Sequence, residues 1–193
     1  QLGVRNGAHL FEQLCFELRD EVDELGFQRA FSAVVARHAA LRTALVWEGV
    51  PRPLQVVLAA IEVPSLRVEL APGSDINAWL EADRTRGFAL DVAPLMRLTW
   101  VRAGDRRHLV WSSHHVLFDG WSMPVVLDEA LRLYVAGRRG VALTLPGVTP
   151  YRDYVAWLAA QDREAGLTYW REQLADLREP FRLALPRPEV AGS

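Results

Sequence analysis

The chain has 193 residues, of which half are hydrophobic, 24% are charged and 9% are aromatic. This composition is ordinary for a globular protein and excludes a disordered or collagen-like chain. Twenty-two basic and 24 acidic residues give a formal charge of −2, so no basic excess favours nucleic-acid binding. No apolar run reaches the ~18 residues that a membrane span needs. The single cysteine, Cys15, indicates a reducing, cytoplasmic compartment.

Hydrophobic periodicity predicts an α+β fold that mixes hairpin strands with helices instead of alternating them strictly. Leu14, Phe16 and Leu18 alternate with other residues and predict the first strand. Cys15 lies between them, and we interpret it as structural because no activating base or helix start is nearby. The later elements are predicted as a helix over 24–38, strands over 41–47 and 51–59, a helix over 75–86, strands over 95–102 and 107–113, and helices over 122–137, 151–162 and 164–176.

One stretch combines groups that can do chemistry. His114 and His115 leave the end of a buried strand, and Asp119 and Gly120 follow just before a helix that we expect Ser122 to cap. An imidazole titrates near neutrality and can exchange a proton with a reacting group. A glycine lets a ligand approach the backbone, and a helix N-terminus favours developing negative charge.

Simpler interpretations of these residues stay open. Neighbouring strand residues face opposite sides, so one histidine is expected to face the core and only one a cleft. Asp119 is equally interpretable as a loop acid or a local cap. We expect no metal site, because adjacent strand histidines do not converge on one ion and no further Cys or His cluster supplies ligands.

Four segments, in order, resemble motifs of one family. Residues 114–120 match the HHxxxDG signature of the chloramphenicol-acetyltransferase-like superfamily, and 114–122 resemble the core motif of nonribosomal peptide synthetase condensation domains. Residues 37–43 resemble the family's RHExLRT segment, with an alanine in place of the usual acid. Residues 88–98 and 151–157 resemble its FDL…PLLR and YxDYxxW segments.

This resemblance implies a fold and a domain organisation. The expected fold is a two-layer α+β sheet-and-helix sandwich of the chloramphenicol-acetyltransferase-like type, forming one lobe of a two-lobe domain. Residues 1–179 are expected to be the N-terminal lobe without its opening helix. Residues 180–193 are expected to be the crossover segment toward an absent second lobe, so that the fragment is inactive alone.

The resemblance also implies a function. A condensation domain forms an amide bond between a donor acyl or peptidyl thioester and the amine of an acceptor aminoacyl thioester. It binds no cofactor directly, because the substrates are carried on the 4'-phosphopantetheine of donor and acceptor carrier proteins. The other implied partners are the C-terminal lobe of the same domain and a neighbouring adenylation domain, in bacterial synthesis of an antibiotic or siderophore. Neither nucleic acid nor membrane is an expected partner.

The resemblance assigns roles to individual residues. His115 matches the essential histidine, which acts either as a base or by positioning the substrate. His114 is expected to support it from behind, and Gly120 to leave room for the phosphopantetheine arm. Asp119 is expected to form an ion pair with Arg42 and to take no part in acid–base chemistry.

Three alternative functions remain at this stage. A free-standing chloramphenicol-acetyltransferase-type enzyme carries its HHxxxDG motif near the C-terminus, whereas 73 residues follow Gly120 here. An epimerisation domain usually departs from the motif at positions 120–121. A noncatalytic condensation-like domain that only recruits a partner would not need the intact His114–His115 pair. The residues after Asp119 resemble domains that accept L-configured donors.

Overall fold

The computed structural model describes residues 10–177. These residues divide into two compact units, one ending at Tyr151 and the other beginning at Arg152. Among the described residues, the first unit holds the strands, three α-helices and a short 3-10 helix, whereas the second holds α-helices. The predicted crossover segment, 180–193, lies outside the described residues.

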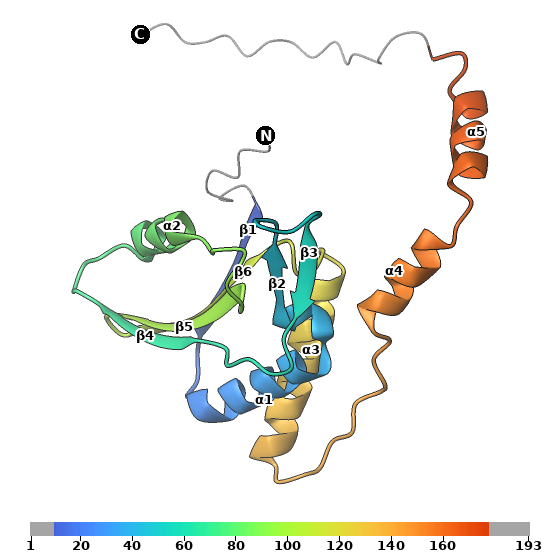
Figure 1. The fold of residues 1–193 in the computed structure, drawn as a ribbon. Coiled ribbons are helices and arrows are strands. Elements are labelled where there is room, and N and C mark those ends of the chain that lie inside the picture. The colour runs from blue at the N-terminus through green and yellow to red at the C-terminus, as the bar shows by residue number, and fades with distance from the viewer. Residues whose placement is uncertain (1–9, 178–193) are drawn as a thin grey trace, which may run out of the picture. The chain divides into compact units, whose positions relative to one another are not determined.

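A four-stranded mixed sheet forms the centre of the first unit (Figure 1). Its outer strand β1 pairs antiparallel with β6, β6 pairs antiparallel with β5, and β4 lies parallel to β5 at the other edge. Gly104, with φ at +62°, makes the tight turn between β5 and β6. The four strands, in sheet order, are β1 (Phe11–Leu18), β6 (Arg106–His114), β5 (Met96–Ala103) and β4 (Ser65–Leu70).

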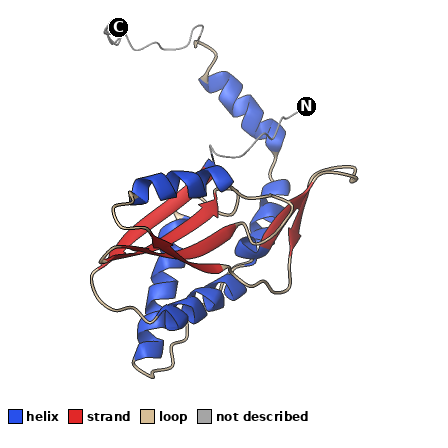
Figure 2. Ribbon diagram, turned by 90° about the vertical axis from the view of Figure 1, so that its left-hand side faces the viewer, coloured by secondary structure: helices blue, strands red, loops and turns tan. Residues whose placement is uncertain are grey.

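Helices cover both faces of this sheet (Figure 2). Helices α1 (Glu24–Arg37) and α3 (Ser122–Arg138) pack on one face, where Phe27 meets Trp100 edge-on and Phe31 meets Trp111. Helix α2 (Ile76–Arg86) lies on the opposite face. The predicted α+β sheet-and-helix fold is confirmed. The fully buried core side chains include Phe31, Val34, Val35, Leu41, Val63, Leu95, Met96, Leu98, Val101 and Val110.

Helix boundaries follow local signals closely. The Asp23 carboxylate accepts a hydrogen bond from the Gly26 amide at 2.9 Å and caps α1. The expected cap of α3 is wrong, because Ser122 is the first helical residue and the carboxylate of Asp119 accepts from its amide. The helix also runs past the predicted end at Gly137, to Arg138, and Gly140 then turns the chain with φ at +64°.

A second, small sheet lies beside the larger one. It pairs β2 (Thr43–Val46) with β3 (Leu54–Val57), and a short 3-10 helix over Ala39–Arg42 precedes it. The two strands predicted over 41–47 and 51–59 correspond to these shorter ones. Strand β4 was not predicted, because an edge strand is recognised by its pairing with β5 and none of its six residues is buried.

The described part of the second unit consists of two helices, α4 (Tyr151–Ala159) and α5 (Arg163–Gln173). Within α4, Tyr154 and Trp157 stack with ring centroids 5.8 Å apart. The Asp162 carboxylate caps α5 by accepting from the Ala165 amide. Among the described residues, no helix has the length and apolar character that a membrane crossing needs.

Candidate functional site

The two histidines of the HHxxxDG turn are fixed through their backbones. His114 is the last residue of β6, and its amide donates to the carbonyl of Leu95 at 2.9 Å. The amide of His115 donates to the carbonyl of Leu10, just before β1, at 2.7 Å. Both neighbours of β6 therefore hold the point at which the chain leaves the sheet.

The His114 side chain is a buried support of the turn. The residue is only 4% exposed, and its Nδ1 accepts a hydrogen bond from the Val116 amide at 3.1 Å. Burial lowers the pKa of the His114 imidazole, and the adjacent His115 lowers it further. A neutral ring whose Nδ1 accepts must carry its proton on Nε2. The His114 ring thus braces the backbone of the turn that carries His115.

The His115 side chain is the reachable one of the pair. It is 38% exposed, and its Nε2 lies 3.6 Å from Oε1 of Glu12 on β1. The chain sends one histidine inward and leaves the other open to a ligand, as alternation at a strand end requires. The sequence motifs assign Glu12 no role, and its place beside His115 follows only from strand pairing.

Asp119 caps α3 and stays at the surface. Its Oδ1 accepts from the Ser122 amide at 2.9 Å and from the Ser122 hydroxyl at 2.7 Å. The hydroxyl hydrogen bond, and then the amide hydrogen bond, hold the pKa of the Asp119 carboxyl below its usual range. The carboxylate is therefore ionised at neutral pH and oriented by its own helix.

The predicted ion pair between Arg42 and Asp119 is wrong. The guanidinium of Arg42 donates through Nη1 to the carbonyls of Leu58, in a short contact, and of Ala59, at 3.1 Å. The described ion pairs do not include one between Arg42 and Asp119. Each group instead has a partner close to it. The amide and hydroxyl of Ser122 satisfy the carboxylate. The chain after β3 accepts from Nη1 of the guanidinium, whose buried Nε has no hydrogen-bond partner among the described residues.

Gly120 leaves open space at the same turn. A Cβ placed there would meet no atom within 4 Å, and its φ lies outside the left-handed region. Neither backbone strain nor a close internal contact therefore explains a glycine at this position. The space beside it is available to a ligand.

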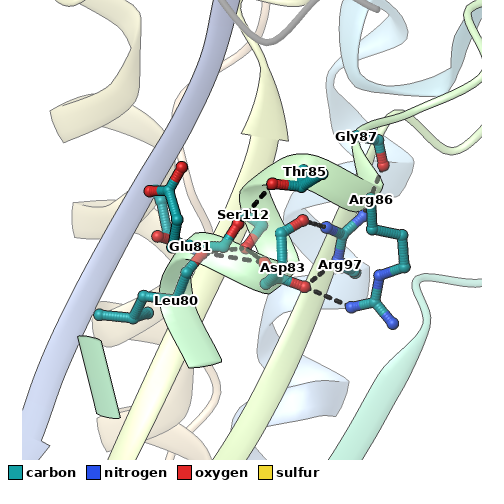
Figure 3. Close-up of polar contacts among 9 residues, drawn as sticks. Leu80, Glu81, Asp83, Thr85, Arg86, Gly87, Arg97 and Ser112 are labelled. Atoms are coloured by element: carbon teal, nitrogen blue, oxygen red, sulfur yellow. Dashed lines mark hydrogen bonds and ion pairs between the residues drawn. The ribbon is translucent and has the colours of Figure 1, made fainter. Parts of the chain in front are cut away.

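A buried polar cluster ties α2 to the sheet (Figure 3). The Asp83 side chain is fully buried, and its Oδ1 accepts from Nε of Arg97 at 2.9 Å and, in a shorter contact, from Arg86. Its Oδ2 accepts from the Ser112 hydroxyl at 2.6 Å and from Nε2 of Gln13 at 2.9 Å. Burial would raise the pKa of Asp83, but the hydrogen bonds from Arg97 and Ser112 outweigh burial and lower it.

The guanidinium of Arg97 completes this cluster. It donates to the carbonyls of Asp83 and Gly87 and lies 4.4 Å from the ring centroid of Phe88. Phe88 and Arg97 both belong to the segment that resembles the FDL…PLLR motif, so the structure brings the two ends of that motif into contact. The sequence motifs assign no role to Asp83 or to the Arg97 side chain. An arginine in the middle of an apolar strand was the available signal for a buried acidic partner.

A second charged cluster joins α1 to α3. Glu129 on α3 accepts from Nε of Arg37 at 3.1 Å and from Nε2 of His38 at 2.7 Å. Arg37 also donates to the carbonyl of Pro146, in the chain after α3, at 2.7 Å. Burial would raise the pKa of Glu129, but the hydrogen bonds from His38 and Arg37 keep it below its usual range. Arg37 and His38 of the RHExLRT-like segment thus bind α3 to the end of α1.

Two other candidate chemistries have little support in the described part of the chain. Across residues 10–177, no three His, Cys, Asp or Glu side chains are grouped so that they could hold a metal ion. Cys15, which we interpreted as structural, is exposed on β1. Partial burial, and then Glu17, raise the pKa of its thiol, which leaves it in the weakly nucleophilic protonated form.

Comparison with known proteins places the chain in a family. The family model for the condensation domain matches residues 4–193. The chain belongs to the condensation-domain family. It is 39% identical over 184 residues to chondramide synthase cmdD of Chondromyces crocatus, and 31% identical over 190 residues to bacitracin synthase 3 of Bacillus licheniformis. These matches cover 93% and 95% of this chain but only 5% and 3% of the two relatives.

A solved condensation domain shares the fold. The first condensation domain of the calcium-dependent antibiotic synthetase, in complex with a substrate analogue, superposes with a TM-score of 0.72 at 23% identity. The superposition covers 91% of this condensation-family chain and 44% of the solved one. The chain therefore spans less than half of a solved condensation domain, and its sheet and helices follow the same architecture.

Proposed function

We propose that this chain is the N-terminal lobe of a nonribosomal peptide synthetase condensation domain. The reaction joins a donor acyl or peptidyl thioester to the amine of an acceptor aminoacyl thioester. The observation that carries the proposal is His115, a partly exposed imidazole whose backbone is pinned between β6 and the start of β1. The family match over residues 4–193 and the synthase relatives support it.

The proposed chemistry needs one proton to move. The acceptor nitrogen attacks the thioester carbonyl carbon, a C–N bond forms, the C–S bond breaks, and the pantetheine sulfur leaves. The nitrogen loses one proton and the sulfur gains one. A neutral amine is already nucleophilic, so His115 can align it first and accept its proton as the tetrahedral intermediate collapses.

The proposal also assigns partners. The thioesters are carried on the 4'-phosphopantetheine arms of donor and acceptor carrier proteins. The open space beside Gly120 supports the proposal that such an arm fits there. The other partners are the C-terminal lobe of the domain and a neighbouring adenylation domain. We place the reaction in the cytoplasm, which the single cysteine supports.

The test of this function is His115→Ala in the multidomain protein that carries this chain. Amide formation would be followed in single-turnover experiments with both carrier proteins loaded. General acid–base catalysis contributes about 100- to 10,000-fold, so the rate should fall by that factor while carrier binding and the unfolding temperature stay unchanged.

The matched control is Asp105→Ala, because Asp105 lies in the turn at the other end of β6. This variant should form the amide at the normal rate. A His115→Ala protein that keeps its full rate would refute the catalytic assignment. An unmutated protein that binds both loaded carriers yet forms no amide would support a noncatalytic, partner-recruiting domain instead.

A further inference from the structure

Strand β1 brings a carboxylate to the proposed catalytic histidine. In the antiparallel register of β1 and β6, Phe11 lies opposite His114 and Glu12 opposite Ser113. Oε1 of Glu12 is 3.6 Å from Nε2 of His115. At this separation the carboxylate forms an ion pair with the imidazole when the ring is protonated. A small side-chain rotation shortens the contact to a hydrogen bond, and one water can also bridge the two atoms.

The residues that flank Glu12 are anchored on the other face of the sheet. Phe11 stacks on Phe88 with ring centroids 5.5 Å apart, and Gln13 donates to the buried carboxylate of Asp83 at 2.9 Å. Because side chains alternate along a strand, anchoring these two on one face directs Glu12 to the opposite face. The carbonyl of Leu10 meanwhile holds the His115 amide at 2.7 Å. The spacing between Glu12 and His115 is thus set by the buried structure.

Both partners of this contact are partly exposed. The two side chains are 39% and 38% exposed, and exposed ion pairs contribute little to the free energy of unfolding. Among the described ion pairs, that of His115 is with Glu12. Burial lowers the pKa of the neighbouring His114 ring, and the Asp119 carboxylate accepts hydrogen bonds from Ser122. Glu12 is therefore the carboxylate that forms an ion pair with His115 when the ring accepts a proton and becomes positively charged.

We propose that Glu12 is a positioning residue for His115, holding the imidazole in its reactive orientation and pairing with it once it is positively charged. This inference rests on the proposed function of His115. It assigns Glu12 no contact with substrate and no proton of its own to transfer. The carboxylate acts through the ring, and its effect falls on the bond-forming step more than on substrate binding.

The first measurement is independent of activity. In the 193-residue chain with ¹⁵N-labelled histidine, Glu12→Gln removes the charge and keeps the size of the side chain. The ring nitrogen signals of His115 should shift, whereas those of His114 should not, because the Val116 amide holds its Nδ1. The matched control is Glu17→Gln, on the same strand but opposite His108, and it should leave the His115 signals in place.

The second measurement is the amide-forming rate of the multidomain protein. Glu12→Gln should lower the single-turnover rate by about two- to fivefold, the rate equivalent of an exposed ion pair, with KM for the acceptor unchanged. Glu12→Asp should recover part of the loss. Unshifted His115 signals, or shifted signals with an unchanged rate, would overturn the inference. If the unmutated protein forms no amide, the proposed function fails. The NMR experiment tests the contact between Glu12 and His115 separately, and unshifted His115 signals would refute it.

Discussion

At the scale of single residues, local partners decide what the charged groups of the motif do. The Ser122 amide at the start of α3 donates to the Asp119 carboxylate at 2.9 Å and to the Asp119 carbonyl at 3.1 Å. Arg42 reaches main-chain carbonyls after β3 instead. The family resemblance predicted that these two residues, which lie in different motifs, would pair. It held no information on which of several nearby acceptors each would use.

The Asp83 carboxylate is fully buried, so the stability of the fold depends on the ion pairs and hydrogen bonds that this group makes. We expect Asp83→Asn to lower the free energy of unfolding by about 3–5 kcal/mol, the usual cost of leaving one member of a buried ion pair without its partner. The orphaned group would be Arg97, whose side chain is also buried. Urea denaturation of the 193-residue chain measures the change.

Glu81→Gln is the control for this substitution. Glu81 lies on the same helix and pairs with Arg84 in an exposed contact, so its loss should change stability by less than about 1 kcal/mol. Equal stability of the Asp83→Asn and Glu81→Gln proteins would show that the cluster does not hold α2 on the sheet.

At the scale of elements, α1 and α3 are joined by charge as well as by apolar packing. Hydrophobic periodicity predicted a helix over 24–38, which ends one residue beyond the observed α1, because this signal is local. Its attachment to α3 was not predictable in the same way. The Glu129 carboxylate that receives Arg37 and His38 lies about ninety residues away along the chain.

Glu129→Gln should weaken this attachment. Loss of the charged acceptor should lower the free energy of unfolding by about 1–3 kcal/mol near neutral pH. The pKa of Glu129 is below its ordinary value of 4.5 in the folded protein. Its stabilising contribution is therefore complete above about pH 4.5 and is lost as the pH falls through the lowered pKa.

Denaturant titrations of both proteins between pH 7 and pH 3 test this expectation. The stability difference between unmutated protein and Glu129→Gln should shrink as the pH falls. Asp128→Asn, which breaks only the exposed pair with Arg132, should show no such difference. A gap that stays constant down to pH 3 would contradict the assignment of the effect to the Glu129 carboxylate.

At the scale of the whole molecule, the chain spans less than half the length of a solved condensation domain. It covers 44% of a solved condensation domain, and the side chain of its His115 is 38% exposed. We expect the 193-residue chain to fold around its apolar core but to form no amide bond alone. Two tethered substrates must be held about 3–3.5 Å apart, and the proposed second lobe supplies the other wall.

Circular dichroism, thermal unfolding and a single-turnover assay with loaded carrier proteins test this expectation together. A cooperative unfolding transition without product is the predicted result. Sustained amide formation by the chain alone would contradict it and would favour a compact acyltransferase that completes its site by self-association.

The sequence alone determined the family, the α+β class, most helices and the position of the HHxxxDG turn, because these depend on motifs, periodicity and capping within short segments. The tertiary structure alone decided which groups meet. Strand pairing brought Glu12 to His115, and the packing of α2 on the sheet brought Asp83 to Arg97. It also added the edge strand β4 and separated Arg42 from Asp119. Contacts between distant segments depend on register and packing, which no short stretch of sequence encodes.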